Sequence, residues 1–460
     1  MKKALVWIRR DLRLHDHSAL SYATNNFEKT FLVFIFDTNI LLKITDKSDH
    51  RITFLHDTLQ ELREKLNNNI YILHGDPKVL IPELAKDLEV DCVCTNEDYE
   101  PYAIKRDDIV RKNLDGIEFR SFKDQVIFNA DEIRNGSDDF YKVFTPYKNN
   151  WFQTIEERPD VLGEKKVNLK NISYSKLKGH GLIPSLTDLG FKRTQKSRTY
   201  DPNPTKKIKD FLKKIDDYEN QRDLPAVDGT SSLSPYLRFG QISVRELMRK
   251  AWTLESAGAK VWMSELAWRD FYFGILKTFP HVEKHAYTRK YENIPWENDK
   301  KKFKAWCEGS TGVPIVDAGM RQLNLTGWMH NRVRMIVASY LTKTLLIDWR
   351  WGEKYFAEKL IDFDLAANNG GWQWSASTGC DAAPYFRVFN PYRQSERFDP
   401  DAQYILKYVS ELADREIKFI HDPTKMKEKD LFTSEYPDPI VDYSFNREKI
   451  ISLFKRAGSL

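Results

Sequence analysis

Five short apolar runs dominate the first third of the chain. They are rich in β-branched and aromatic residues and lie at 4–8, 30–36, 69–74, 90–95 and 117–122. Runs of this length and composition are typical of parallel strands that are buried on both faces. The segments between them place apolar residues at three- and four-residue steps, as an amphipathic helix does. This alternation predicts a doubly wound parallel α/β sheet over residues 1–130.

The pattern changes after residue 130. Between 131 and 205 the apolar periodicity weakens while Gly, Pro, Ser and Lys accumulate, which predicts a long interdomain linker. From 206 to 460 the pattern turns helical, with few credible strands. We therefore expect an α/β + all-α protein, in which the linker joins the sheet domain to an all-helical domain.

Composition excludes two classes of protein. The 460 residues are 41% hydrophobic and contain no apolar run of the ~18 residues that a membrane helix needs, so membrane-spanning and disordered chains are excluded. Four cysteines are too few for a disulfide scaffold and are typical of a reducing compartment. The cytoplasm is the default location, and a nuclear one stays open for a eukaryotic source.

The net charge of +5 is too small to identify a nucleic-acid binder, but its distribution is informative. Residues 1–130 hold 19 basic and 22 acidic side chains, and the remainder holds 53 and 45. A basic surface for a partner is therefore expected in the later part of the chain.

Three segments contain polar residues in patterns that suggest a site. GTSSLSP at 229–235 reads either as a helix cap and turn or as an anion cradle of hydroxyl and amide groups. On 262–272, Glu265, Trp268 and Arg269 share one helical face, as the end of an amphipathic helix or the wall of a pocket for a polar aromatic ligand. No GxGxxG follows the first strand and no GxxxxGK[ST] occurs, so the usual nucleotide fingerprints are missing.

The third pattern combines WMHNRVRM at 328–335 with LIDFDLAANNGGWQWSAS at 360–377, a run in which Asp362, Asp364, Asn368 and Asn369 stand among residues apolar enough to be buried. Asn331, Arg334 and Met335 fall on one helical face, and Asp362 is a natural partner for Arg334. Asp362 with Asp364 could instead indicate metal or glycosidase chemistry, but no histidine cluster accompanies them. No metal site is therefore predicted.

Long motifs in the chain resemble the photolyase and cryptochrome family. They are WIRRDLRLHDHSAL at 7–20, KVFTPYKNNW at 142–151, YENQRDLPAVDGTSSLS at 218–234, TGVPIVDAGMRQL at 311–323, NRVRMIVASYLTKTLLIDWR at 331–350 and DLAANNGGWQW at 364–374. The sequence is most similar to the microbial class that repairs cyclobutane pyrimidine dimers. The one departure inside these motifs is Tyr340, where the family usually has phenylalanine.

The resemblance implies FAD folded back on itself inside the helical domain. The positions that match flavin contacts are Tyr218, Thr230, Ser231, Ser232, Leu233, Ser234, Trp262, Glu265, Arg269, Asn331, Arg334, Asp362, Asp364 and Asn368. Asn368 matches the residue that faces the ring nitrogen protonated on reduction. Plant photoreceptors of the family carry aspartate there and animal ones cysteine, so the amide favours the reduced flavin that repair requires.

The implied reaction is light-driven electron transfer from FADH− to a dimer flipped out of the duplex. Glu265 and Asn331 match groups that hydrogen-bond the dimer, Met335 lies beside it, and Trp268 and Trp374 match the wedge against which it packs. The matches to contacts with the DNA strand are Arg222, Arg332, Arg387 and Gln394. Those to the electron-transfer chain from the surface to the flavin are Trp306, Trp349 and Trp372.

Two further expectations follow from the resemblance. An antenna pigment is expected in the sheet domain. Tyr102 and Ala103 replace the Asn-Glu pair of folate-binding relatives, which disfavours folate, and a deazaflavin, a second flavin or an empty pocket are the alternatives. The protein is expected to be a monomer that acts on damaged DNA without a membrane partner. The alternative function is a cryptochrome-type blue-light receptor.

Overall fold

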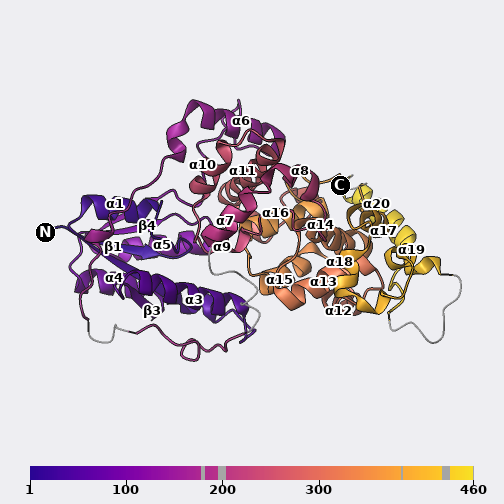
Figure 1. Cartoon of the computed structure of the whole chain (residues 1–460), viewed down its shortest axis with the longest axis horizontal. Helices are drawn as coiled ribbons and strands as arrows, with labels where there is room; N and C mark the ends of the chain where they lie inside the picture. Colours follow the sequence, from indigo (N-terminus) through magenta and orange to yellow (C-terminus); the bar gives the residue numbers. More distant parts are fainter. Residues whose placement is uncertain (178–181, 195–203, 385–386, 427–435, 459–460) are drawn as a thin grey trace. The chain divides into compact units, whose positions relative to one another are not determined.

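The computed structural model describes residues 1–177, 182–194, 204–384, 387–426 and 436–458 (Figure 1). These residues form two compact units. The first unit consists of Met1–Lys213 and Ser231–Thr278, and the second of Lys214–Thr230 and Phe279–Leu460. This grouping differs from the predicted boundaries at 130 and 205, which stay a prediction about domains.

A five-stranded parallel sheet forms the centre of the first unit, in the indigo part of the chain in Figure 1. Its strands are β1 (Lys3–Ile8), β2 (Lys29–Asp37), β3 (Tyr71–Gly75), β4 (Cys92–Asn96) and β5 (Glu118–Phe122). They lie in the order β3-β2-β1-β4-β5, so the chain crosses from one half of the sheet to the other after β3. The five predicted runs and the doubly wound topology are confirmed.

Alternate residues of β1 pack into different cores, as expected for a strand covered on both faces. Ala4, Val6 and Ile8 pack with residues of helices α1 (Ser18–Asn26) and α3 (His50–Lys65). Leu5 and Trp7 pack with residues of α4 (Pro77–Asp87) and α5 (Pro101–Asn113). This double covering explains why the predicted strands are continuous apolar runs rather than alternating ones.

The remaining helices of the first unit include one within the predicted linker. They are α2 (Thr38–Leu41), α6 (Phe144–Glu157), α7 (Pro204–Leu212), α9 (Ser234–Arg238), α10 (Val244–Trp252) and α11 (Ala257–Thr278). Helix α6 buries Tyr147 and Trp151, so the 131–205 stretch is not only a surface connection. The two aromatic residues lie four positions apart, a signal too short to outweigh the Gly, Pro and Lys around it.

A buried carboxylate ties these parts of the first unit together. Asp270 of α11 accepts hydrogen bonds from the backbone N–H groups of Ile127 (2.8 Å) and Phe128 (3.2 Å) and from the indole of Trp151 (3.0 Å). Burial raises the pKa of Asp270 to about 6. These bonds fix α11, which carries predicted site residues, against α6 and the end of the sheet domain.

The second unit is helical. Its α-helices are α8 (Tyr218–Gln221), α12 (Lys300–Glu308), α13 (Pro314–Thr326), α14 (Asn331–Ser339), α15 (Trp349–Lys359), α16 (Leu365–Ala376), α17 (Pro391–Phe398), α18 (Gln403–Tyr408), α19 (Ile417–His421) and α20 (Tyr443–Gly458). A π-helix, Tyr340–Thr344, follows α14. Within the described ranges, no helix is long and apolar enough to cross a bilayer.

Candidate active site

The predicted side chains divide between the two units. In the first unit, Glu265, Trp268 and Arg269 lie on the single 22-residue helix α11, as their spacing predicts. The ring of Trp268 stacks on that of Phe144, with a centroid distance of 3.6 Å and an interplanar angle of 11°. Trp262 is buried and packs against Phe211 at 5.1 Å. The indole of Trp268 is therefore held rigidly, as a wedge against a flat ligand requires.

Arg269 is anchored within the first unit. Its guanidinium donates a hydrogen bond to the carbonyl of Gln125 and lies over the ring of Phe273, 4.5 Å from the centroid. These contacts hold the guanidinium end of a side chain that is predicted to contact the flavin. That contact itself stays a prediction.

The serine-rich segment adopts a turn in which side chains are close to the backbone. Ser232 has a φ of 50°, a left-handed conformation that is uncommon outside glycine. The hydroxyl of Ser231 accepts a hydrogen bond from the backbone N–H of Leu233 at 3.4 Å. Helix α9 begins at Ser234, with Pro235 in its first turn, so the predicted helix start is confirmed. The predicted turn is therefore confirmed, but the predicted cap is wrong, because Leu233 precedes the helix and, among the described residues, no side chain caps it. The anion cradle stays a prediction.

A glycine fixes the chain just before this turn. A Cβ at Gly229 would lie 2.5 Å from the Cβ of Gln221 and 2.9 Å from its carbonyl oxygen. Only glycine allows the segment to pass this close to α8, the short helix that begins at Tyr218. Tyr218 is buried, and the guanidinium of Arg222 lies 5.5 Å from its ring centroid.

The predicted pair of Arg334 and Asp362 is confirmed in the second unit. The Arg334 Nη2 donates to the Asp362 Oδ2 at 2.8 Å, and its Nε donates to the carbonyl of Met329 at 2.8 Å. The carboxylate of Asp362 is almost fully buried. Asp364 instead caps α16 by accepting from the backbone N–H of Ala366. The described residues contain no cluster of three or more His, Cys, Asp and Glu that could hold a metal ion.

Asn368 is oriented by a residue that sequence patterns did not reveal. Its Nδ2 donates to the carbonyl oxygen of Glu353 (3.1 Å) and to the carboxyl Oε1 of the same residue (2.8 Å). Burial raises the pKa of Glu353 to about 7. Both amide hydrogens are thereby used, and among the described residues no donor is bonded to Oδ1 of Asn368. The adjacent Asn369 instead donates to the carbonyl of Val282.

Helix α14 begins with residues predicted to contact the dimer and the DNA strand. The Asn331 amide lies 3.9 Å from the sulfur of Met335, so the predicted shared face is confirmed. His330 caps the helix, because its Nδ1 accepts from the backbone N–H of Arg332 at 3.2 Å. This bond places the ring hydrogen of the neutral imidazole on Nε2. His330 is buried, and burial lowers its pKa from 6.5 to about 4.

Stability should therefore fall as the pH drops from 6.5 to 4. In this window the unfolded chain binds a proton at His330 while the folded protein does not, at a cost of about 3 kcal/mol when complete. His330→Asn keeps a side-chain acceptor for the cap and removes this titration. Urea unfolding at pH 7, 6 and 5 should show a smaller loss of stability in the variant than in the wild type. Equal losses would contradict this assignment.

The predicted tryptophan chain needs a correction. Trp306, Trp349 and Trp372 are all buried, with Trp306 0% exposed, so these three residues cannot by themselves reach the surface. The Trp306 indole donates to the carbonyl of Val337 at 3.1 Å, and its ring meets that of Trp372 edge-on at 6.0 Å. The assignment failed because tryptophan spacing in the sequence carries no information on exposure.

Trp296 is the better candidate for the exposed end. It is partly exposed and packs against the core cluster that contains Trp349. Its segment is fixed beside that tryptophan, since the Glu297 N–H donates to the carbonyl of Leu346 (2.8 Å) and the Asp348 N–H donates to Asn298 (2.9 Å). The partly exposed Trp351, on the same helix as Trp349, is the second candidate.

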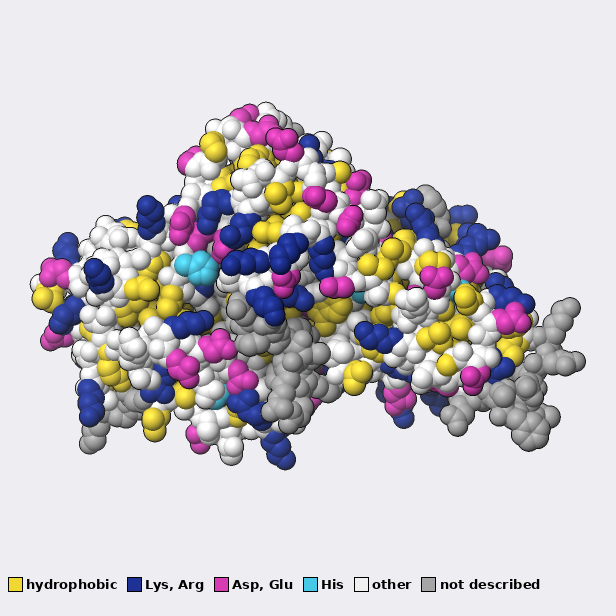
Figure 2. Space-filling model, in the orientation of Figure 1, with side chains coloured by type: hydrophobic (Ala, Val, Ile, Leu, Met, Phe, Trp, Pro, Cys, Tyr) yellow, Lys and Arg dark blue, Asp and Glu magenta, His cyan; other side chains and the backbone are white. Residues whose placement is uncertain are grey.

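The predicted contacts to the DNA strand, Arg222, Arg332, Arg387 and Gln394, all belong to the second unit. Arg387 is exposed, and its carbonyl accepts from the buried Lys343 at 3.2 Å. Gln394 is half-buried on α17, and Trp374 is half-buried on α16. Arg332 is ion-paired with Asp223 at 2.7 Å, a partner that the sequence did not indicate. On the face drawn in Figure 2, basic and acidic side chains both occur throughout, in keeping with their near-equal numbers.

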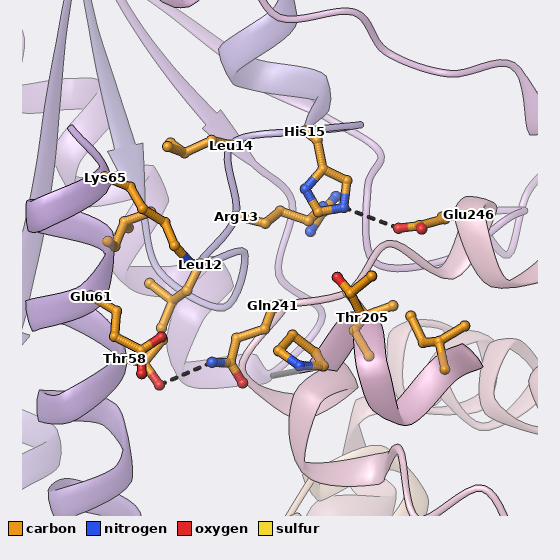
Figure 3. Close-up of a pocket in the computed structure, with 14 residues that line it drawn as sticks. Leu12, Arg13, Leu14, His15, Thr58, Glu61, Lys65, Thr205, Gln241 and Glu246 are labelled. Atoms are coloured by element: carbon orange, nitrogen blue, oxygen red, sulfur yellow. Dashed lines mark hydrogen bonds and ion pairs between the residues drawn. The ribbon is translucent and has the colours of Figure 1, made fainter. Parts of the chain in front are cut away.

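A pocket of about 480 Å³ lies in the first unit (Figure 3). It is bounded by Arg13 and His15 after β1, by Thr58 of α3 and by Gln241 and Glu246. His15 pairs with Glu246 at 3.0 Å, and Gln241 donates to Thr58 at 3.1 Å. The size suits a small ligand. The described lining contains no Phe, Tyr or Trp, so no large aromatic ring is present on which a flat ligand could stack.

Tyr102, which with Ala103 stands in place of the Asn-Glu pair of folate-binding relatives, makes its polar contacts with other residues of the sheet domain. The hydroxyl of Tyr102 donates to Asp37 at 2.8 Å, and Arg106 lies 5.6 Å from the centroid of the Tyr102 ring. The antenna and its identity stay predictions.

Comparison with known proteins assigns both the sheet region and the helical region of the chain to the family that the sequence motifs resemble. Residues 4–164 match the family described as DNA photolyase, and residues 262–456 match the FAD binding domain of DNA photolyase. The chain is 39% identical to a deoxyribodipyrimidine photo-lyase of Vibrio cholerae, over 98% of this chain and 99% of that protein.

Two solved structures place the fold in the same group. An archaeal photolyase from Sulfolobus tokodaii with two FAD molecules is 35% identical with a TM-score of 0.85, covering 99% of this chain and 100% of the other. A cryptochrome of Synechocystis is 26% identical with a TM-score of 0.86, covering 98% and 99%. Because it is 39% identical to the Vibrio cholerae protein over nearly its whole length, the chain belongs to the DNA photolyase family.

Proposed function

We propose that this chain uses light to split cyclobutane pyrimidine dimers in DNA, as a deoxyribodipyrimidine photo-lyase. The observation that carries the proposal is the full-length identity of 39% to a protein of that name. A monomer that acts on damaged DNA in the cytoplasm is part of the proposal.

The polar side chains predicted to contact the cofactor suit FAD. Hydroxyl groups of Thr230, Ser231, Ser232 and Ser234 supply hydrogen-bond donors of the kind that a diphosphate accepts. The pair of the partly exposed Arg334 and the buried Asp362 supplies a fixed charge of each sign for the polar edge of the flavin ring. When bound in its reduced form, FAD would supply the electron that opens the cyclobutane ring and accept it back.

Asn368 favours the reduced cofactor through its orientation. Glu353 takes both hydrogens of the Asn368 amide, which leaves the carbonyl oxygen as the group that faces a ligand. A carbonyl oxygen accepts a hydrogen bond from a protonated ring nitrogen and repels an unprotonated one. The pair of Glu353 and Asn368 would thus hold a proton at the ring nitrogen.

Other residues of the chain would act on the dimer. Glu265 would accept a hydrogen bond from an imide N–H of the dimer, and the Asn331 amide would donate one to a carbonyl group of the dimer, which stabilises negative charge in a water-poor site. Trp268 and Trp374 would form the apolar wall, with Met335 beside Asn331. Flipping the dimer costs less than flipping an intact base pair, because the damaged bases stack poorly.

Replacing Glu265 tests this assignment. Glu265→Ala should slow light-driven repair by about 10- to 100-fold, because a hydrogen bond that orients the dimer in the site is lost. Flavin content should change little. Repair rates of the reduced proteins on a thymine-dimer oligonucleotide give the comparison, with Ser264→Ala on the same helix as the matched control. A repair rate equal to that of the control would reject the role of Glu265.

The similarity to a cryptochrome keeps a blue-light receptor as the second candidate. An enzyme turns over many dimers under light, whereas a receptor with the same cofactor does not. An antenna pigment is also part of the proposal, with folate, a deazaflavin and a second flavin as its candidates. The archaeal neighbour with two FAD molecules supports the last of these.

A further inference from the structure

Arg332, a proposed contact to the DNA strand, is held on two sides within the second unit. The carboxylate of Asp223 accepts from Arg332 Nε at 3.2 Å and from Nη2 at 2.7 Å. The ring of Phe398 covers one face of the guanidinium, with the carbon of that group 4.3 Å from the ring centroid. The three residues come from the segment after α8 and from helices α14 and α17.

This arrangement leaves one edge of the guanidinium for a ligand. A guanidinium has five N–H groups, which form two edges that can each grip an anion through two hydrogen bonds. Asp223 takes the edge formed by Nε and Nη2. Among the described residues, the edge formed by Nη1 and Nη2 has no hydrogen-bond partner, and the side chain of Arg332 is 17% exposed. The open edge has the geometry that binds two oxygens of one phosphate.

Holding Arg332 has two consequences for binding. An arginine whose side chain is already ordered loses less conformational freedom when it grips a phosphate. In addition, the charge of Asp223 offsets that of Arg332, so the pair attracts the phosphates of any DNA less than a free arginine would. The first effect favours one docked geometry, and the second weakens non-specific binding.

We propose that Asp223 is a positioning residue that aims the open edge of Arg332 at a single phosphate of the DNA strand and thereby raises the preference for damaged over undamaged DNA. Phe398 helps to hold Arg332 in this position by covering one face of its guanidinium. The inference rests on the proposed function, and it assigns to Asp223 a role in selectivity rather than in the chemistry.

The test measures binding of the dark holoprotein to two labelled duplexes that differ only in one thymine dimer. Asp223→Asn keeps the size of the side chain and removes its charge. We expect it to bind undamaged DNA more tightly and dimer DNA less tightly. The ratio of the two dissociation constants, undamaged DNA over dimer DNA, should therefore fall about fivefold. Asp228→Asn is the matched control, because Asp228 lies in the same segment and pairs with a different cation, Lys214 (2.6 Å).

Further variants separate positioning from general charge. In an Arg332→Gln background, Asp223→Asn should leave the ratio unchanged, because the side chain that it positions is absent. Phe398→Leu should lower affinity for dimer DNA while flavin content stays at the wild-type level. Salt titrations should show a slope about one smaller for Arg332→Gln, as for the loss of one phosphate contact.

Three outcomes would overturn the inference: a ratio unchanged by Asp223→Asn, an equal fall with Asp228→Asn, or a fall that persists in the Arg332→Gln background. Flavin content and thermal stability of each variant are measured alongside, and a loss of either without a change in the ratio counts against positioning. A wild-type protein that binds both duplexes equally would instead reject the proposed function, before any variant is compared.

Discussion

Replacing Arg334 with alanine should leave a folded protein that binds FAD at least about 10-fold more weakly than the wild type. The guanidinium is bonded to the carboxylate of Asp362, whose side chain is only 2% exposed, and to the carbonyl of Met329. Removing one partner of a buried ion pair costs about 3–5 kcal/mol, because the other charge stays buried without it. If only half of that cost falls on the flavin complex, affinity for FAD drops at least about 10-fold.

Two comparisons make this result specific. Arg321→Ala removes a similar pair in the same unit, Arg321 with Glu411 at 2.7 Å, and should keep its flavin. Arg334→Lys keeps the positive charge but loses the second hydrogen-bonding arm, so its affinity should be intermediate. The measurements are the ratio of flavin to protein absorbance after purification and a titration of the apoprotein with FAD. Wild-type affinity in Arg334→Ala would remove Arg334 and Asp362 from the cofactor site.

Replacing Trp372 with phenylalanine should slow light-driven reduction of the bound flavin by more than an order of magnitude. Phenylalanine cannot be oxidised under these conditions, so a hole cannot move outwards through that position. Repair by protein that was reduced chemically beforehand should be unaffected, since the proposed chain of tryptophans would serve only to re-reduce the cofactor. The rate at which oxidised flavin absorbance is lost in blue light, with a thiol in solution, gives the measurement.

The same assay shows which tryptophan is the solvent-exposed end of the electron-transfer chain. Trp296→Phe should reproduce most of the loss seen with Trp372→Phe, because Trp296 is partly exposed and its segment is bonded to the one that precedes Trp349. Trp306→Phe should have a small effect, because that indole is fully buried. A large effect of Trp306→Phe with none of Trp296→Phe would restore the trio expected from the sequence. Trp351→Phe tests the remaining candidate.

Features that depend on neighbours in the chain could be predicted from the sequence. The five strands follow from runs of apolar residues, and the shared face of Glu265, Trp268 and Arg269 follows from helical spacing. The bond between Arg334 and Asp362 joins residues 28 positions apart, but it was predictable because a buried carboxylate and an arginine in one apolar region need each other.

Features that depend on distant contacts could not be predicted. Glu353 orients Asn368 from another helix, and Asp223 pairs with Arg332 across 109 positions of the chain, yet neither acid stands in a distinctive local pattern. The burial of Trp306 was missed for a related reason. Exposure is set by which helices pack together, whereas an isolated tryptophan looks the same in a core and at a surface.

Light-driven repair itself decides whether the proposed function is correct. Holoprotein whose flavin has been reduced is mixed with an excess of DNA that contains thymine dimers, and one half is kept dark while the other receives blue light. We expect dimers to disappear over many turnovers in the light and to persist in the dark. Dimers that survive illumination while the flavin remains bound and reduced would contradict the proposed function.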